Sequence, residues 1–490
     1  MTRSQVTINY ILRTLGLGLW VALGPVGCGS DSKNTPVGNT ADAGYAITAE
    51  GATSSVIGTV GIVTFTVSGA PSLDSAVIKF GLDTNYGLSA PVDVTTQASH
   101  YRTLLLGMKE SHTYHYQVVA QSGTTTYASP DYTIVTGGCP TSIKRPTVAT
   151  TSGVDKAQLD GGFMVMEGYR AYDARTSLDD FAYILDGDGD VVWCYKPAGS
   201  GDLMAARMTW DGKYMWLVHG NTPQVTGGAH MGRVTMDGLD PETHSTAYFD
   251  DHSAEFAGLN HDAAVLPNDA GIAYIAYGSG GCDDVKLWTP GGTSRVIINS
   301  GTVFSNADAC HGNAVKYDGN DQTLIVSDDD SSAYYKVDLQ GNVKWVLGGG
   351  EYNSFDKAGG GASTWVGQHN LDILGTKDDG LYHILFFNNG TSSTDTSGTH
   401  AVARELALDL TAMTTKEVWT YDSDPDIGNP ILGDVQRLTN GNTLVTYSLA
   451  GTIQEVDANY NVLQSFTWNS STGSVGYVTK RANLYGPSPR

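Results

Sequence analysis

The chain has 490 residues, of which 28 are Lys or Arg and 51 are Asp or Glu, so its formal net charge is −23. Only 16% of the residues are charged, whereas Gly (60 residues) and Tyr (26 residues) are abundant, a composition that favours β-sheet with tight turns over helix bundles. The acidic charge argues against a nucleic-acid partner, whose phosphates the surface would repel. The length predicts two to four domains, or one small and one large.

Residues 1–27 have the features of a signal peptide. Two arginines and no acid precede an apolar run over residues 15–26, which has the length of a secretory core and is short for a membrane span. Small residues then lead to Cys28, which opens a polar tether over residues 28–44 and resembles a bacterial lipoprotein box. This resemblance implies lipidation of Cys28. We therefore expect an exported periplasmic or cell-surface lipoprotein that meets the membrane only through its lipid anchor, or, alternatively, a secreted protein.

Residues 45–137 alternate in strand fashion, with turn residues at each break. About 90 residues with strand-only patterning predict a β-sandwich of the fibronectin type III or Ig-like kind. The stretch from Leu104 to Val118 resembles the E–F corner of fibronectin type III domains, where a tyrosine ties the corner to the backbone.

Four cysteines follow Cys28 in the chain, an even number in an oxidising compartment. We expect the disulfide Cys282–Cys310 together with Cys139–Cys194, one of the three pairings that four cysteines allow. No CxxC spacing occurs, so a thiolate zinc site is not expected.

Residues 150–490 contain an internal repeat of about 50 residues. Each unit has one hairpin with an Asn/Asp-Gly turn and a second hairpin with an Asp-led turn and a terminal aromatic residue; clear copies of the second hairpin lie at 182–193, 334–345, 406–419 and 453–468. Two hairpins give a four-stranded sheet with exposed edges, which radial repetition protects. The pattern predicts an all-β chain in which a six-bladed β-propeller over 150–490, closed by residues 475–484, follows the sandwich.

Three histidines share one position in consecutive repeats. His261, His311 and His369 each open the inner hairpin of a repeat, at spacings of 50 and 58 residues. The innermost strands of a propeller line its central channel, so this register predicts that the three imidazoles meet in one small volume. The alternative is a structural role, in which each imidazole relays hydrogen bonds between strands.

An ordered series of motifs resembles the bacterial arylsulfate sulfotransferases, exported propeller enzymes that move sulfate between phenols without a nucleotide donor. The matching stretches are residues 261–262, 311–315, 336–349, 368–369, 387–390 and 435–444. The resemblance implies small-molecule substrates, an aryl sulfate and a phenol, and no cofactor or metal.

The same resemblance implies roles for individual residues. His369 would be the nucleophile that carries a sulfohistidine, and His261 would act as acid and base on the phenol oxygens. His311 and Asn313 would donate hydrogen bonds to sulfuryl oxygens, and Ser448 would be a further hydroxyl donor.

One position departs from the family. Asp329 stands where the family has an arginine that clamps the sulfate. At about 4 Å and an effective dielectric near 20, its carboxylate would repel a sulfate by roughly 4 kcal/mol. The cation would then come from Arg207, Arg437 or Lys336 on another repeat, or the substrate would differ.

Two other functions remain open at the level of sequence. One is a metal-dependent hydrolase or lyase built on His261, His311, His369 and Asp329, and the other is a surface propeller that binds without catalysis. The acidic run at 186–190 fits a hairpin turn better than a calcium loop, because no acid follows at the twelfth position.

Overall fold

The structure is a computed structural model, and it describes residues 45–69, 72–95, 100–169, 181–197, 202–220, 230–278, 280–305, 310–356, 365–390, 400–423, 425–468 and 474–486. The predicted signal peptide, Cys28 and the tether lie outside the described residues. In the described ranges no helix is long and apolar enough to cross a membrane. These ranges contain 34 β-strands and one short α-helix, α1 (Ser300–Phe304), besides three 3₁₀ turns, so the prediction of an all-β chain is confirmed.

The first eight strands form two antiparallel sheets around a core of their own. Fully buried residues of β6 alternate with half-buried or exposed ones, which is the pattern of a strand with one face in a core. The backbone N–H of Lys109 donates to the hydroxyl of Tyr114 over 2.8 Å, which is the tie that the resemblance to the E–F corner implies. The strands are β1 (Ala46–Thr53), β2 (Gly61–Ser68) and β5 (His100–Leu105) in one sheet, and β4 (Leu88–Val92), β3 (Ser75–Gly81), β6 (Thr113–Ser122), β7 (Thr125–Ala128) and β8 (Tyr132–Val135) in the other.

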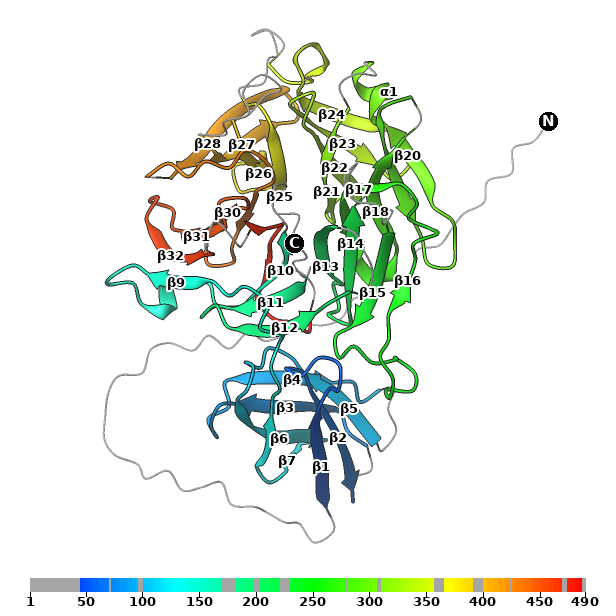
Figure 1. Cartoon of the computed structure of the whole chain (residues 1–490), viewed down its shortest axis with the longest axis vertical. Coiled ribbons are helices and arrows are strands. Elements are labelled where there is room, and N and C mark those ends of the chain that lie inside the picture. The colour runs from blue at the N-terminus through cyan, green and yellow to red at the C-terminus, as the bar shows by residue number, and fades with distance from the viewer. Residues whose placement is uncertain are drawn as a thin grey trace, which may run out of the picture. The chain divides into compact units, whose positions relative to one another are not determined.

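Within the described residues, six further antiparallel sheets follow in chain order (Figure 1). In the second to fifth sheets the first strand in the chain is one edge, and each strand pairs with the next. The last four strands of the sixth sheet pair in the same way, and a strand from earlier in the chain, Thr147–Thr150, is its other edge.

The first three of these sheets contain β10 (Phe163–Tyr169), β11 (Ala182–Asp186) and β12 (Val191–Tyr195); β13 (Asp202–Met208), β14 (Tyr214–Gly220), β15 (His230–Thr235) and β16 (Asp250–Asp251); and β17 (Leu259–Val265), β18 (Ile272–Tyr277), β19 (Asp283–Trp288) and β20 (Arg295–Asn299). The last three contain β21 (Gly312–Asp318), β22 (Thr323–Asp328), β23 (Ala333–Asp338) and β24 (Val343–Gly348); β25 (Gln368–Thr376), β26 (Tyr382–Asn388), β27 (Val402–Asp409) and β28 (Thr414–Asp422); and β29 (Asp434–Arg437), β30 (Thr443–Tyr447), β31 (Thr452–Val456), β32 (Val462–Thr467) and β9 (Thr147–Thr150).

The sixth sheet is also a neighbour of the first. The first strands of consecutive sheets contact one another from β10 to β29. Near the C-terminus, β33 (Ser474–Val475) and β34 (Thr479–Arg481) pair with β10, as the pattern at residues 475–484 predicts. Gln436 of β29 exchanges hydrogen bonds of 2.9 and 2.7 Å with the backbone of Lys480 in β34. The contacts therefore lead from the first sheet to the sixth and back to the first.

Polar side chains tie the first strands of the sheets together. Asp262 of β17 accepts a hydrogen bond from its neighbour Ala263 (2.8 Å) and one from the backbone of Val315 in β21 (3.2 Å). Asn370 of β25 donates over 2.8 Å to Asp434 of β29. Each of these ties lies one residue after His261 or His369, so the contacts that join the sheets also fix the backbone that carries the two histidines.

Two disulfides and a set of ion pairs join segments that are distant in the chain. Cys139 is bonded to Cys194, and Cys282 is bonded to Cys310. Lys109, which follows β5, lies between the carboxylates at the β11–β12 turn, at 3.3 Å from Asp186, 3.0 Å from Asp188 and 2.6 Å from Asp190.

Candidate active site

Two histidines of the predicted triplet touch. The Nε2 atoms of His261 and His311 lie 2.9 Å apart, with the ring centroids at 4.6 Å. His261 has a positive φ of 55° at a shift in the β17–β18 register, and this local bend of the strand accompanies its approach to the next sheet. In this contact one ring donates and the other accepts, so both rings cannot carry a proton on Nε2.

Burial keeps His261 neutral. Desolvation, with a smaller contribution from the charges of His311 and His369, lowers the pKa of His261 well below its ordinary value of 6.5. The charge of His369 also contributes to this lowering, so the third histidine lies within electrostatic range of His261. The structure thus brings the three imidazoles into one region.

The protonation of His369 is fixed by Asn389. The side chain of Asn389 donates from Nδ2 to the carbonyls of Asn429 (2.6 Å) and Leu432 (2.7 Å), so its Oδ1 faces His369 as an acceptor. Nδ1 of His369 lies 2.8 Å from that oxygen and 3.3 Å from the carbonyl of Gly367. Because both partners are acceptors, Nδ1 carries the hydrogen and Nε2 keeps its lone pair.

His369 is also held as the neutral base. The residue is 6% exposed, and burial lowers its pKa from 6.5 to about 4, although the contacts with Asn389 and Gly367 oppose the shift. A neutral imidazole with a free nitrogen can attack an electrophile without prior loss of a proton.

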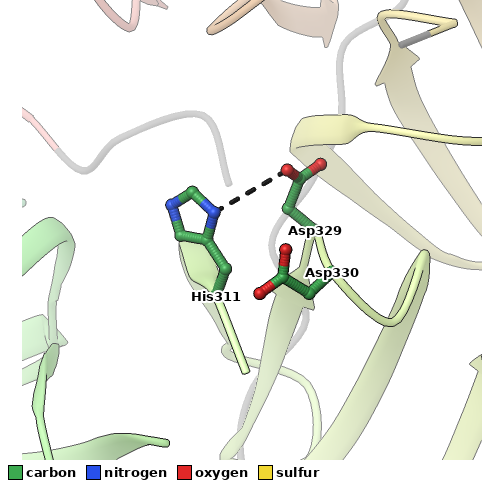
Figure 2. A group of neighbouring side chains, drawn as sticks. All are labelled: His311, Asp329 and Asp330. Atoms are coloured by element: carbon green, nitrogen blue, oxygen red, sulfur yellow. Dashed lines mark ion pairs between the residues drawn. The ribbon is translucent and has the colours of Figure 1, made fainter. Parts of the chain in front are cut away.

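Two carboxylates lie close to the imidazole of His311. Its Nδ1 lies 3.7 Å from Oδ2 of Asp329, and Asp330 lies beside them (Figure 2). The backbone N–H of Asp329 donates to the carbonyl of His311 over 2.8 Å, which fixes this pair. Burial raises the pKa of Asp329 to about 6, an effect that His311 opposes and Asp330 reinforces. Burial also raises the pKa of Asp328 to about 7.

The disulfide Cys282–Cys310 positions His311. Cys310 immediately precedes His311, and Cys282 immediately precedes Asp283, the first residue of β19. The carboxylate of Asp283 accepts a hydrogen bond of 2.9 Å from the backbone of Gly312. The segment that carries His311 is therefore held by a covalent bond and a hydrogen bond to the preceding sheet.

Asn313 and Ser448, the expected hydrogen-bond donors to a sulfuryl group, both donate to backbone carbonyls. Asn313 is fully buried, and its amide donates to the carbonyl of Gln368 over 2.7 Å, next to His369. Ser448 is also fully buried and donates to the carbonyl of Gly476 over 3.1 Å. Each side chain donates a hydrogen bond to the backbone of a neighbouring sheet, because the packing of the first strands buries it there.

The three cations proposed to replace the missing arginine are all paired with carboxylates. Arg207 lies 2.6 Å from Asp262, and Lys336 lies 2.7 Å from Asp318 and 2.9 Å from Asp321. The cationic groups of Arg207 and Lys336 are therefore already paired and are not open for binding a sulfate.

Arg437 is engaged in the same way. Its guanidinium lies 2.7 Å from Glu405 and 4.9 Å from the ring centroid of Trp419, at the end of β29 opposite to Asp434. The structure does not place Arg437 with the three histidines.

A cavity of about 800 Å³ opens at the far ends of the same first strands. Among the described residues that line it are Lys316, Asp318, Leu374 and Gln436, whereas His261, His311 and His369 are not. The cavity is separate from the histidine site.

Sequence reasoning assigned no role to three residues that lie near the histidines: Asn389, Asp330 and Asp283. Asn389 lies in one of the stretches that match the family, residues 387–390, but nothing in that stretch predicts its contact with His369. The position of Asp283 directly after a paired cysteine was the available signal for its closeness to His311.

Comparison with known proteins supports the family resemblance over the C-terminal part of the chain. The model of the arylsulfotransferase (ASST) family matches residues 293–484, so the resemblance to this family is confirmed over that range. The range includes His311, Asp329 and His369 but not His261. The match supports an arylsulfotransferase-like function. No curated protein matches the chain.

Solved structures resemble the chain only slightly. A protein of unknown function from Bacteroides caccae is 12% identical, with a TM-score of 0.41, over 65% of this chain and 98% of its own. A mutant of NanB sialidase from Streptococcus pneumoniae is 8% identical, with a TM-score of 0.29, over 88% of this chain and 69% of its own. Structural similarity at these TM-scores does not indicate a function.

Proposed function

We propose that the protein is an arylsulfate sulfotransferase in which His369 takes a sulfuryl group from an aryl sulfate and passes it to a phenol, without a nucleotide donor. The observation that carries the proposal is the contact between His369 and Asn389. This contact leaves a neutral imidazole with a free Nε2, and His369 lies close enough to His261 for their charges to interact.

In the first half-reaction, Nε2 of His369 attacks the sulfur of the aryl sulfate. The N–S bond forms, the S–O bond to the aryl group breaks, and its electron pair leaves on the phenolate oxygen. The imidazole then carries a positive charge, which the hydrogen bond from Nδ1–H to Asn389 stabilises. In the second half-reaction, the oxygen of an acceptor phenol attacks the same sulfur and the pair of the N–S bond returns to Nε2.

One proton has to be moved between the two phenols. The acceptor loses a proton as its oxygen attacks, and the departing phenolate needs one. His261 is neutral at pH 7, so it can accept the proton from the acceptor and pass it to water, while the departing phenolate takes its proton from water. His311 touches His261 through Nε2 and is placed to orient His261.

The proposal includes the architecture and location predicted from the sequence. The six sheets would be the blades of a six-bladed β-propeller over 150–490, and the first eight strands would be a fibronectin type III-like sandwich over 45–137. Support comes from the sheet order and from the pairing of β33 and β34 with β10. Residues 1–27 would direct export, and Cys28 would carry the lipid anchor.

Rapid mixing with a chromogenic aryl sulfate tests the proposal. We expect a burst of phenol equal in amount to the protein, followed by turnover that rises with added acceptor phenol. His369→Ala should lose the burst. His400→Ala is the matched control, because His400 is 79% exposed and pairs with Asp426 away from the histidine motif. An acceptor-independent, steady release of phenol would favour the metal-dependent hydrolase, and no release would favour a binding propeller.

A further inference from the structure

His311, Asp329 and Asp330 form a compact set of possible metal ligands. One ligand atom from each residue lies within 4.8 Å of the other two. Figure 2 shows the imidazole and the two carboxylates turned toward a shared space. The side chain of His311 is 41% exposed and Asp330 is exposed, so an ion in solution can reach this space.

Within the described residues, one buried oxygen of this cluster and one of the preceding residue lack a hydrogen-bond partner. Oδ1 of Asp329 is buried and accepts no hydrogen bond from any described residue. Asp328 is fully buried, and its Oδ2 is likewise without a partner in the described part of the chain, although its Oδ1 accepts from the backbone of Ser331. Buried carboxylate oxygens ordinarily have a hydrogen-bond donor or a cation, so Oδ1 of Asp329 points to a ligand that neutralises the cluster.

A second cluster of acids shows what such neutralisation looks like in this protein. Asp186, Asp188 and Asp190 also form a compact ligand set, but the ammonium of Lys109 lies within 3.3 Å of all three. Among the described residues, neither Asp329 nor Asp330 forms an ion pair with a lysine or arginine, and Arg207, Lys336 and Arg437 pair with Asp262, Asp318 and Glu405.

The donor set selects a class of ion. One imidazole nitrogen and two carboxylates suit Zn²⁺ or Mn²⁺, whereas Ca²⁺ and Mg²⁺ prefer oxygen alone. Binding through Nδ1 of His311 requires the hydrogen on Nε2, which then donates to Nε2 of His261 over the observed 2.9 Å.

We infer that His311, Asp329 and Asp330 bind a divalent transition-metal ion that takes the place of the family's sulfate-clamping arginine. The two carboxylates beside His311 would repel an aryl sulfate bound there, whereas a bound dication cancels their charge and offers a sulfuryl oxygen an open coordination position. The binding of the ion follows from this cluster alone, and its role in sulfate binding rests on the proposed function.

Metal binding can be measured without any assay of transfer. The full chain is stripped with a chelator and titrated separately with Zn²⁺, Mn²⁺ and Mg²⁺ by calorimetry, and Co²⁺ is added as a spectroscopic probe of a nitrogen-containing site. We expect one ion per chain, Zn²⁺ or Mn²⁺ well ahead of Mg²⁺, and a visible absorption band with Co²⁺. Asp330→Asn should weaken binding by about 100-fold or more, because outer-sphere partners alone are worth about 10–100-fold. Asp330 is exposed, so this variant should fold normally.

Asp378→Asn is the matched control, since Asp378 is an exposed carboxylate on the turn after β25. The inference is overturned if no ion binds in stoichiometric amount, or if Asp330→Asn and Asp378→Asn bind it equally well.

The role of the ion is tested by phenol release from an aryl sulfate before and after the ion is restored. Equal release by the stripped and restored protein overturns the role of the ion and leaves the transferase proposal intact. If binding is lost only in Asp330→Asn but the restored protein releases no phenol, the metal site stands and the transferase proposal fails.

Discussion

Oδ1 of Asn389 lies 2.8 Å from Nδ1 of His369, and both amide hydrogens of Asn389 are directed to the carbonyls of Asn429 and Leu432. The amide therefore cannot rotate to offer a donor to His369 without the loss of two buried hydrogen bonds. This relationship sets which imidazole nitrogen of His369 is available for reaction.

The first prediction concerns Asn389. Replacing Asn389 by Ala removes the acceptor that holds the hydrogen on Nδ1, so the tautomer with a free Nε2 is no longer favoured. We expect the phenol burst to slow by about 10²-fold, the size of effect seen when a buried partner of a catalytic group is removed. Asn459→Ala, at an exposed turn, should react like the unaltered protein. An unchanged burst in Asn389→Ala would contradict the assigned tautomer.

The second prediction is the effect of pH on stability. The unfolded chain protonates His369 near pH 6.5, whereas the folded chain keeps it neutral down to about 4. The contribution of this group to the free energy of unfolding is complete above pH 6.5 and is lost as the pH falls to about 4, by about 3 kcal/mol. Urea unfolding at pH 7 and pH 4.5, for the protein and for His369→Gln, isolates this contribution. Equal losses in both would show that His369 does not have a lowered pKa.

The third prediction concerns the same pKa in the reaction. Because His369 is neutral until about pH 4, the acid limb of the phenol burst should lie near that value and not near 6.5. Asn389→Asp places a negative charge beside Nδ1, which stabilises the protonated ring and should move the limb to higher pH. A limb at the same pH in both proteins would exclude His369 as the group that titrates.

The fourth prediction concerns a buried ion pair next to His261. Asp262 is fully buried and pairs with the buried guanidinium of Arg207 at 2.6 Å. Asp262→Ala leaves that charge without its partner, so we expect the free energy of unfolding to fall by about 3–5 kcal/mol. Adding Arg207→Met should recover part of the loss, which a double-mutant cycle in urea measures. A loss below about 1 kcal/mol in Asp262→Ala would contradict a structural role of the pair.

The fifth prediction separates the two disulfides. Cys282–Cys310 adjoins His311, whereas Cys139–Cys194 joins residue 139 to β12. Replacing both cysteines by Ser in either bridge should cost about 3–4 kcal/mol of stability by the loop-entropy relation. Only the loss of Cys282–Cys310 should also slow the burst, because it frees the segment that carries His311. Similar slowing in both pairs of variants would mean that the effect is a general loss of stability.

Much of the fold is predictable because it depends on local chemistry. The Asp-led turns were visible in the sequence, and in the structure Asp338 accepts hydrogen bonds from the backbone of Gln340 and Asn342 at such a turn. The spacing of the histidines indicated their meeting, since residues at one position of a repeat face the same region. Periodicity carries such information because every repeat is built in the same way.

The remaining features depend on contacts between side chains of different repeats. Asn313 has the residue type of a sulfuryl donor, but packing turns its amide to the carbonyl of Gln368. Arg207 and Arg437 looked available as cations, and their carboxylate partners lie 55 and 32 residues away in the chain. No local pattern indicates such pairs, because each depends on how two sheets meet.

The central claim, that His369 carries the sulfuryl group, is tested most directly by trapping that intermediate. The protein is mixed with an aryl sulfate in the absence of acceptor, quenched in alkali and digested. The masses of the peptides are then measured by mass spectrometry. The account predicts the added mass of one sulfuryl group on the imidazole of His369, lost when a phenol is added before the quench and unaffected in His400→Ala. A burst of phenol with no sulfuryl group on any peptide, or with the group on His261 or His311, would contradict it.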